Sequence, residues 1–164
     1  MIMTTIRLVF ALMISTPATA QEIRRLAFEN IEAPISAAVS VPRDARTLYV
    51  SGTLPDMADA TAQRGTAAAY GLTETQTLSV LAKIKEVLGR EGMGMGDVVS
   101  MRVFLVGDAR LGGRMDFAGM MRAYRSIYGS DQKPKVPART AVQVVGLPIP
   151  GALVEIEVVA AKMK

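Results

Sequence analysis

The stretch Leu153-Val154-Glu155-Ile156-Glu157-Val158-Val159-Ala160 alternates in the way that a β-strand with two different faces requires. One face is wholly apolar and is expected beneath helices; it consists of Val154, Ile156, Val158 and Ala160. The other mixes carboxylates with apolar residues: Leu153, Glu155, Glu157 and Val159. This second face must meet either water or another subunit, and its apolar members favour a subunit.

Four other runs show the composition or alternation of strands. They are Ala37–Val41, Thr47–Ser51, Asp97–Val106 and Thr140–Val145. The five residues from Pro42 to Arg46 make a connection suitable for a hairpin between the first two runs. Residues 146–151 join the last two strands, and their two prolines exclude a continuous strand there.

Two segments have helical periodicity. Thr73–Gln76 has the T-x-x-Q form of a capping box, and it is followed by Leu78, Leu81, Ile84 and Leu88. The second segment carries a methionine and aromatic stripe that is expected in the core: Phe117, Met120, Met121, Tyr124, Ile127 and Tyr128. Between the strands and the first helix, Pro55–Leu72 is interpreted as an ordered or partly helical excursion.

The resulting order, β-β-α-β-α-β-β, predicts an α+β fold. It suits a single mixed β-sheet with two helices packed on one face. The two helices can cover only one side of that sheet, which again leaves the carboxylate-bearing face of 153–160 for solvent or a partner.

The first twenty residues are unlike the rest. Arg7 precedes the apolar run Leu8–Ile14, and Ala18-Thr19-Ala20 ends the segment. This is typical of a signal peptide with an h-region too short to span a bilayer. A buried N-terminal helix is the alternative, but the run has no polar helical face. The prediction is a signal peptide at 1–20, a domain at 21–164 beginning at Gln21, a periplasmic or secreted location, and no membrane attachment after cleavage.

Composition excludes several classes of chemistry. The chain has no cysteine and no histidine, so it offers no thiol nucleophile, no Ser-His-Asp triad and no zinc-finger pattern. Loss of the first twenty residues removes only Arg7 among the charged residues and leaves a net charge of +3. The basic residues are spread along the chain without a dense stripe, which argues against nucleic-acid binding.

The chain resembles the RidA (YjgF-like) family. The most specific match is Pro137-Ala138-Arg139-Thr140-Ala141-Val142-Gln143-Val144 followed by Leu147-Pro148 and residues 151–157. Weaker matches are Thr47–Gly52, Asp97–Val99, Val103–Leu105 and the segment Phe117–Tyr124. Together they cover nearly all of the chain after residue 20.

The resemblance implies a chorismate-mutase-like fold, a homotrimer whose sheets form a central barrel, and active sites between subunits. It also implies hydrolysis of 2-imino acids such as 2-iminobutanoate and 2-iminopropanoate to 2-keto acids, with no cofactor and no metal. A guanidinium is well shaped to hold the substrate carboxylate, and Arg139 stands at the family's arginine position. Glu155 matches the family glutamate and would handle water and protons, while backbone near Gly52 would complete the pocket.

Some positions depart from the family pattern. Ile35 stands where the family usually has a tyrosine that lines the pocket, and it cannot donate a hydrogen bond. Thr53 and Met121 replace a glutamine and an asparagine. These changes predict a less polar pocket edge, and hence either a bulkier or more apolar imino acid or weaker catalysis.

Other interpretations remain open from the sequence. Arg139 could form an ion pair with Glu155 or Glu157 on a neighbouring strand. Glu157 itself is interpreted as a solvated or interface charge. The whole protein could instead be a non-catalytic trimer that binds small carboxylates or a protein partner. Nuclease activity has low weight because basic residues are sparse.

Overall fold

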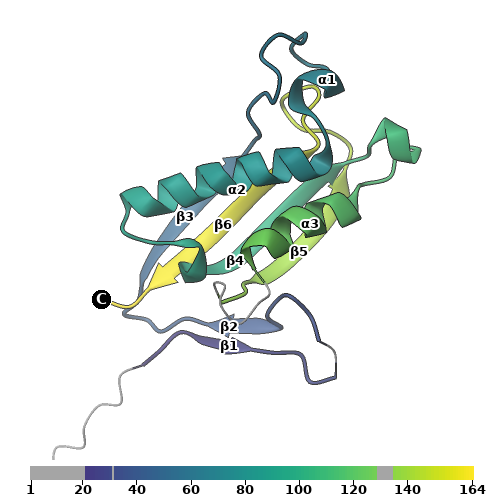
Figure 1. Cartoon of the computed structure of the whole chain (residues 1–164). Coiled ribbons are helices and arrows are strands. Elements are labelled where there is room, and N and C mark those ends of the chain that lie inside the picture. Colours follow the sequence, from purple (N-terminus) through teal and green to yellow (C-terminus); the bar gives the residue numbers. More distant parts are fainter. Residues whose placement is uncertain (1–20, 31, 129–134) are drawn as a thin grey trace, which may run out of the picture.

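The computed structural model describes residues 21–30, 32–128 and 135–164. Its main element is a four-stranded sheet with the order β3-β6-β4-β5 (Figure 1). The strands are β3 (Arg46–Thr53), β4 (Val98–Val106), β5 (Ala138–Val144) and β6 (Val154–Lys162). β6 runs antiparallel to both β3 and β4, whereas β5 runs parallel to β4. The predicted mixed sheet is therefore confirmed.

Two helices, α2 (Thr73–Arg90) and α3 (Phe117–Ile127), lie side by side on one face of this sheet (Figure 1). The apolar face of β6 is buried beneath them, as predicted: Val154, Ile156, Val158 and Ala160 are at most 2% exposed. Glu155, Glu157 and Val159 on the other face are only partly buried. Leu153 differs from the prediction because it precedes β6 and packs in the core.

The buried side of α2 is shifted from the predicted one. Leu81, Ile84 and Leu88 are fully buried, but Leu78 is 43% exposed. Thr77 and Val80 take the place expected for Leu78. They fall on the same helical face as Ile84 and Leu88, since residues three, four or seven apart share a face.

The predicted hairpin between 37–41 and 47–51 is wrong. β2 (Ala38–Ser40) pairs instead with β1 (Arg24–Leu26) in a separate two-stranded sheet, visible below the main sheet in Figure 1. β3 is the edge strand next to β6. β6 offers a nine-residue partner for the eight residues of β3, far more than the three residues of β2.

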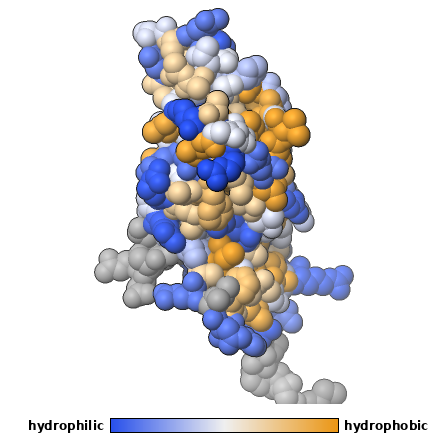
Figure 2. Space-filling view, turned by 90° about the vertical axis from the view of Figure 1, so that its right-hand side faces the viewer, coloured by the Kyte–Doolittle hydropathy of each residue, from blue (hydrophilic) through white to orange (hydrophobic). Residues whose placement is uncertain are grey.

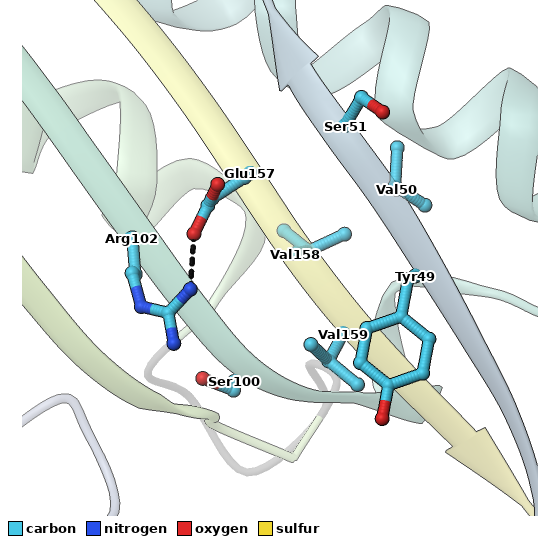
Figure 3. Close-up of a pocket in the computed structure, with 8 residues that line it drawn as sticks. All are labelled: Tyr49, Val50, Ser51, Ser100, Arg102, Glu157, Val158 and Val159. Atoms are coloured by element: carbon cyan, nitrogen blue, oxygen red, sulfur yellow. Dashed lines mark hydrogen bonds and ion pairs between the residues drawn. The ribbon is translucent and has the colours of Figure 1, made fainter.

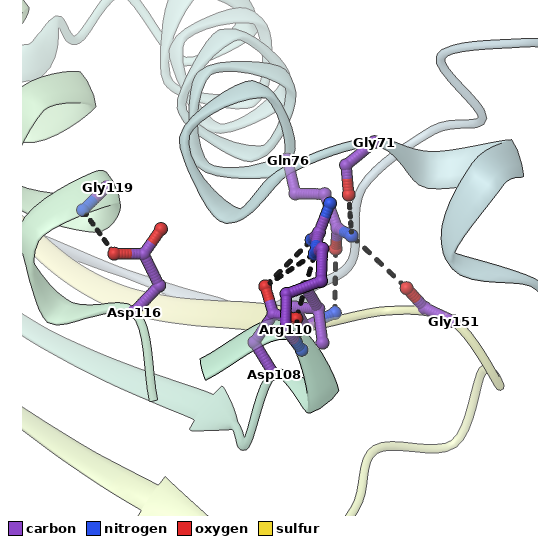
Figure 4. Close-up of polar contacts among 8 residues, drawn as sticks. Gly71, Gln76, Asp108, Arg110, Asp116, Gly119 and Gly151 are labelled. Atoms are coloured by element: carbon purple, nitrogen blue, oxygen red, sulfur yellow. Dashed lines mark hydrogen bonds and ion pairs between the residues drawn. The ribbon is translucent and has the colours of Figure 1, made fainter. Parts of the chain in front are cut away.

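The predicted capping box at Thr73–Gln76 is also wrong. Leu72 is the N-cap of α2, and Gln76 is fully buried. Its Nε2 donates to the carbonyl oxygens of Gly71 at 3.2 Å and Gly151 at 3.1 Å, and the Leu153 amide donates to its Oε1 at 2.7 Å (Figure 4). Gln76 thus fastens the connection before β6 to the start of α2.

The predicted excursion after β3 is ordered and contains one short helix, α1 (Ala67–Tyr70). Two contacts hold its start to α2: Lys83 pairs with Asp56 at 2.7 Å, and the Asp56 amide donates to Ser79 Oγ at 3.0 Å. The predicted signal peptide lies outside the described residues. Among the residues described, no helix is long and apolar enough to cross a membrane.

Replacing Gln76 with leucine should lower the free energy of unfolding by about 3 kcal/mol, because one buried amide and two carbonyl groups lose their partner. Urea unfolding followed by circular dichroism measures this loss. The matched control is Gln63→Leu at an exposed position, which should stay within about 0.5 kcal/mol of the parent protein. Equal effects of the two substitutions would show that Gln76 does not fasten the loop.

Candidate functional site

Glu155 lies on the face of the sheet that the helices do not cover. In the register of β6 with β4 it is opposite Phe104, whose neighbours Val103 and Leu105 point into the core. Partners in register share one face of a sheet. The Glu155 carboxylate is half-buried, and no described residue donates a hydrogen bond to it. It is therefore available to a ligand.

Gly52, which the sequence suggested for the pocket because it lacks a side chain, lies beside Glu155. A methyl group built on Gly52 would overlap Glu155 Oε1 and lie 2.8 Å from its Cδ. The pairing of β3 with β6 shifts between Val50 and Thr53, so Gly52 lies in a bulge. Bulges often redirect side chains next to functional sites. Here the bulge and the missing side chain together leave room for the carboxylate.

Glu157 has a different role from Glu155. It forms an ion pair with Arg102 on the neighbouring strand β4. Figure 3 shows this pair at one side of a pocket that Tyr49, Ser100 and Val159 also line. Both partners are partly exposed on the uncovered face, so Glu157 is a charge with an arginine partner, whereas Glu155 has none among the described residues.

Arg139 lies on the opposite face of the sheet, toward α3. In the register of β5 with β4 it is beside Met101, which is buried in the core. Its guanidinium carbon lies 4.2 Å from the centroid of the Tyr124 ring and 6.0 Å from that of Phe117. The predicted alternative of an ion pair with Glu155 or Glu157 is wrong, because these side chains project from the other face.

The Arg139 guanidinium has unused hydrogen-bonding capacity. Its Nε and Nη1 are buried, and among the described residues neither has a hydrogen-bond partner. Burial lowers the pKa of Arg139 from its usual value, with Tyr124 opposing that change, but an arginine remains charged at any physiological pH. A buried cation with unsatisfied donors is a strong attractor for a carboxylate.

Ile35 is on the same side as Arg139. The adjacent Ser36 donates through its amide to Pro137 O at 2.9 Å and through Oγ to Val136 O at 2.8 Å, which holds residues 34–36 against the start of β5. Ile35 is half-buried against the core and lines a surface pocket with Ser36 and Val136. Met121 was expected both in the core stripe of its helix and at the pocket edge; it is buried in the core.

The predicted residues thus form two half-sites. One contains Glu155 and Gly52 on the uncovered face, and the other contains Arg139 on the helix side. Ile35 also packs on the helix side, but the pocket that it lines does not include Arg139. The sheet separates them within one chain. A substrate that contacts both Arg139 and Glu155 must therefore lie between two chains.

Two aromatic residues around Arg139 were interpreted from the sequence only as core. Tyr124 is indeed fully buried, but Phe117 is 43% exposed beside Arg139. Phe117 begins α3, after the N-cap Asp116, whose side chain accepts from the Gly119 amide at 2.8 Å (Figure 4). A first-turn residue has no preceding helical turn to cover it, and this position is the signal that distinguishes Phe117 from the rest of the stripe.

Apolar side chains also reach the surface near the edge strand β5. Val142 is 41% exposed, and Val145 just beyond the strand is fully exposed. Figure 2 shows apolar groups interspersed with hydrophilic ones on the side of the molecule that lies at the right of Figure 1. This side is therefore not a uniformly polar surface.

Comparison with known proteins matches this chain to a single family. Residues 31–162 match the family model described as Endoribonuclease L-PSP. A RutC family protein from Sulfurisphaera tokodaii is 34% identical over 129 residues, which cover 79% of this chain and 88% of the relative.

Solved structures of the same kind have the same fold. The conserved Rid family protein YyfB from Yersinia pestis matches with a TM-score of 0.61 and 27% identity, covering 87% of this chain and all of that one. A YjgF family protein from Neisseria meningitidis matches with a TM-score of 0.51 and 25% identity, covering 87% of this chain and 97% of that one.

Replacing Gly52 with alanine should displace the Glu155 carboxylate while leaving the fold intact. The end of a glutamate side chain can swing aside, so the free energy of unfolding should change by less than about 1 kcal/mol. A crystal structure of the variant would show the new Glu155 position. The control is Gly89→Ala, where an added methyl group meets nothing within 4 Å; an unmoved Glu155 in Gly52→Ala would contradict the expected overlap.

Proposed function

We propose that this chain, which belongs to the Endoribonuclease L-PSP (Rid/YjgF) family, hydrolyses reactive 2-imino acids to 2-keto acids and ammonia. The observation that carries the proposal is the buried Arg139 guanidinium, which has two unsatisfied donors and no acidic partner among the described residues. A substrate carboxylate would supply the missing acceptor. 2-Iminobutanoate and 2-iminopropanoate are the proposed substrates.

The chemistry assigns one task to each half-site. Arg139 holds the carboxylate through paired hydrogen bonds and so fixes the position of the adjacent imine carbon. Glu155 accepts a proton from a water molecule as its oxygen bonds to that carbon. The same carboxyl group returns this proton to the nitrogen, which gives a carbinolamine. Glu155 then accepts the proton of the carbinolamine hydroxyl and passes it to the amino group, so that the C=O bond forms as the C–N bond breaks and ammonia and the 2-keto acid leave. Gly52 keeps the space in which this carboxylate and the water meet.

The proposal includes a homotrimer with sites shared between neighbouring chains. The separation of Arg139 and Glu155 by the sheet supports it, because one chain alone cannot present both groups to one substrate. The uncovered sheet face also supports it, since Tyr49 is 78% exposed there and Val142 is exposed on the same face. Exposed apolar surface of this kind favours association with another copy.

Mixing two inactive variants tests the shared site. Arg139→Ala and Glu155→Gln should each lower kcat/KM for 2-iminobutanoate about a hundredfold, through loss of the carboxylate contact and of the proton acceptor. Trimers assembled from equal amounts of both chains should recover about a quarter of the parent activity, because a site that takes one residue from each of two neighbours is intact in one arrangement of four. Release of 2-oxobutanoate from imine freshly generated by an amino-acid oxidase is the readout.

Controls separate the possible failures. Arg102→Gln breaks the ion pair with Glu157 but keeps both Arg139 and Glu155. Mixed in equal amounts with Arg139→Ala, it should give about half of its own activity, because a site is intact whenever its arginine comes from the Arg102→Gln chain. Activity that does not recover on mixing would place both residues in one chain's site. A folded trimer that binds 2-oxobutanoate through Arg139 without accelerating hydrolysis would instead favour a non-catalytic carboxylate binder, the alternative left open by the sequence.

The proposal also places the mature protein outside the cytoplasm. Its support is the n-region, apolar run and Ala-x-Ala exit of residues 1–20. Expression of the full chain in a Gram-negative host should give periplasmic protein whose N-terminal residue is Gln21, as read by mass spectrometry. Ala20→Arg should block that processing because the cleavage site requires a small residue, and full-length protein in the cytosol from the unaltered chain would overturn the assignment.

A further inference from the structure

Arg139 is held by an aromatic ring instead of an acidic group. Its guanidinium carbon lies 4.2 Å from the Tyr124 ring centroid, close enough for a strong cation–π contact, whereas Phe117 is more distant at 6.0 Å. The described ion pairs do not include Arg139. Of the two rings, that of Tyr124 is therefore the closer to this cation.

Tyr124 is itself fixed from both ends. It is fully buried, and its hydroxyl donates to Pro34 O at 2.8 Å. Its ring stacks on that of Tyr128, with centroids 4.8 Å apart and planes at 25°. The Tyr128 hydroxyl donates in turn to Met95 O at 3.1 Å. Burial raises the pKa of Tyr124 to about 12, so the ring remains neutral at working pH and its hydroxyl is already engaged.

We infer that Tyr124 is a positioning residue for the substrate carboxylate: its ring face orients the Arg139 guanidinium without using any of that group's hydrogen-bond donors. An acidic side chain at position 124 would accept hydrogen bonds from those donors. It would also neutralise the guanidinium charge that must attract the substrate carboxylate. The aromatic face avoids both effects. This inference rests on the proposed carboxylate-binding role of Arg139.

The inference predicts an effect specific to charge. Tyr124→Leu should weaken binding of 2-oxobutanoate about tenfold, the order expected for loss of a desolvated cation–π contact. Binding of the uncharged analogue 2-oxobutanamide should change much less, because it lacks the carboxylate that Arg139 holds. Isothermal titration of the purified oligomer measures both. Tyr124→Phe, which keeps the ring and removes only the bond to Pro34, should restore most of the lost affinity.

Tyr128→Leu is the matched control. Tyr128 has the same residue type, is equally buried and follows Tyr124 by four residues, but the cation–π contacts of Arg139 are with Tyr124 and Phe117. Its replacement should lower the melting temperature comparably while affecting 2-oxobutanoate binding less than Tyr124→Leu does. Equal weakening by the two variants, or equal weakening of acid and amide by Tyr124→Leu, would reduce Tyr124 to a purely structural residue and overturn the inference.

A second series keeps the test decisive if Tyr124→Leu does not fold. Phenylalanine and its mono-, di- and trifluorinated forms placed at position 124 have nearly the same shape but progressively weaker negative potential on the ring face. Affinity for 2-oxobutanoate should fall steadily along this series, and a flat series would overturn the inference.

Turnover separates this inference from the proposed function. Carboxylate binding that depends on Tyr124 without imine hydrolysis would sustain the inference and reject the enzyme. Hydrolysis that depends on Arg139 but does not change with the residue at position 124 would support the enzyme and overturn this inference. Absence of any 2-oxobutanoate binding by the parent protein would overturn the role of Arg139 and this inference together.

Discussion

The strict alternation of side chains along the four-stranded sheet governs the arrangement of the site. Each residue of β5 and β6 must point either toward the helices or away from them. Arg139 is in register with the buried Met101, and Glu155 is in register with Phe104 on the uncovered face. No side-chain rotation brings the two groups together through a hydrogen-bonded sheet. A function that used both groups would depend on the meeting of two chains, because the pairings of β5 with β4 and of β4 with β6 set the two side chains on opposite faces.

The environment of Arg139 explains how a cation can be kept ready for a ligand inside a protein. A buried guanidinium without partners is destabilising, and most proteins satisfy it with a carboxylate. Here the rings of Tyr124 and Phe117 lie over it, and two of its nitrogens have no partner among the described residues. The proposed substrate would supply the missing anion, so stability given up in the free protein would be regained as binding energy. Elsewhere in the core, the buried Gln76 fastens the connection that leads into β6 through its hydrogen bonds to Gly151 and Leu153.

Most of the helices and strands could be predicted from the sequence, because each one depends on a pattern within its own short segment. Period-two alternation at 153–160 and helical spacing at 117–128 predicted elements that the structure confirms within a few residues. The pairing of strands was less accessible, because β2 is short and nothing within it distinguishes β1 from β3 as its partner. Gln76 was misassigned since a capping-box pattern depends only on neighbouring residues, whereas its real partners include Gly151 and Leu153, more than seventy residues away.

The sequence by itself determined the α+β class, the two-faced last strand, the family resemblance and the identity of Arg139, Glu155 and Gly52 as candidate site residues. These features are carried by periodicity and by contiguous motifs, which survive without knowledge of the fold. Only the tertiary structure decided that Arg139 and Glu155 lie on opposite sides of the sheet, that Glu157 belongs to Arg102, and that Tyr124 supports the guanidinium. Such relations depend on strand register and on packing between distant segments, and no local pattern in the chain encodes them.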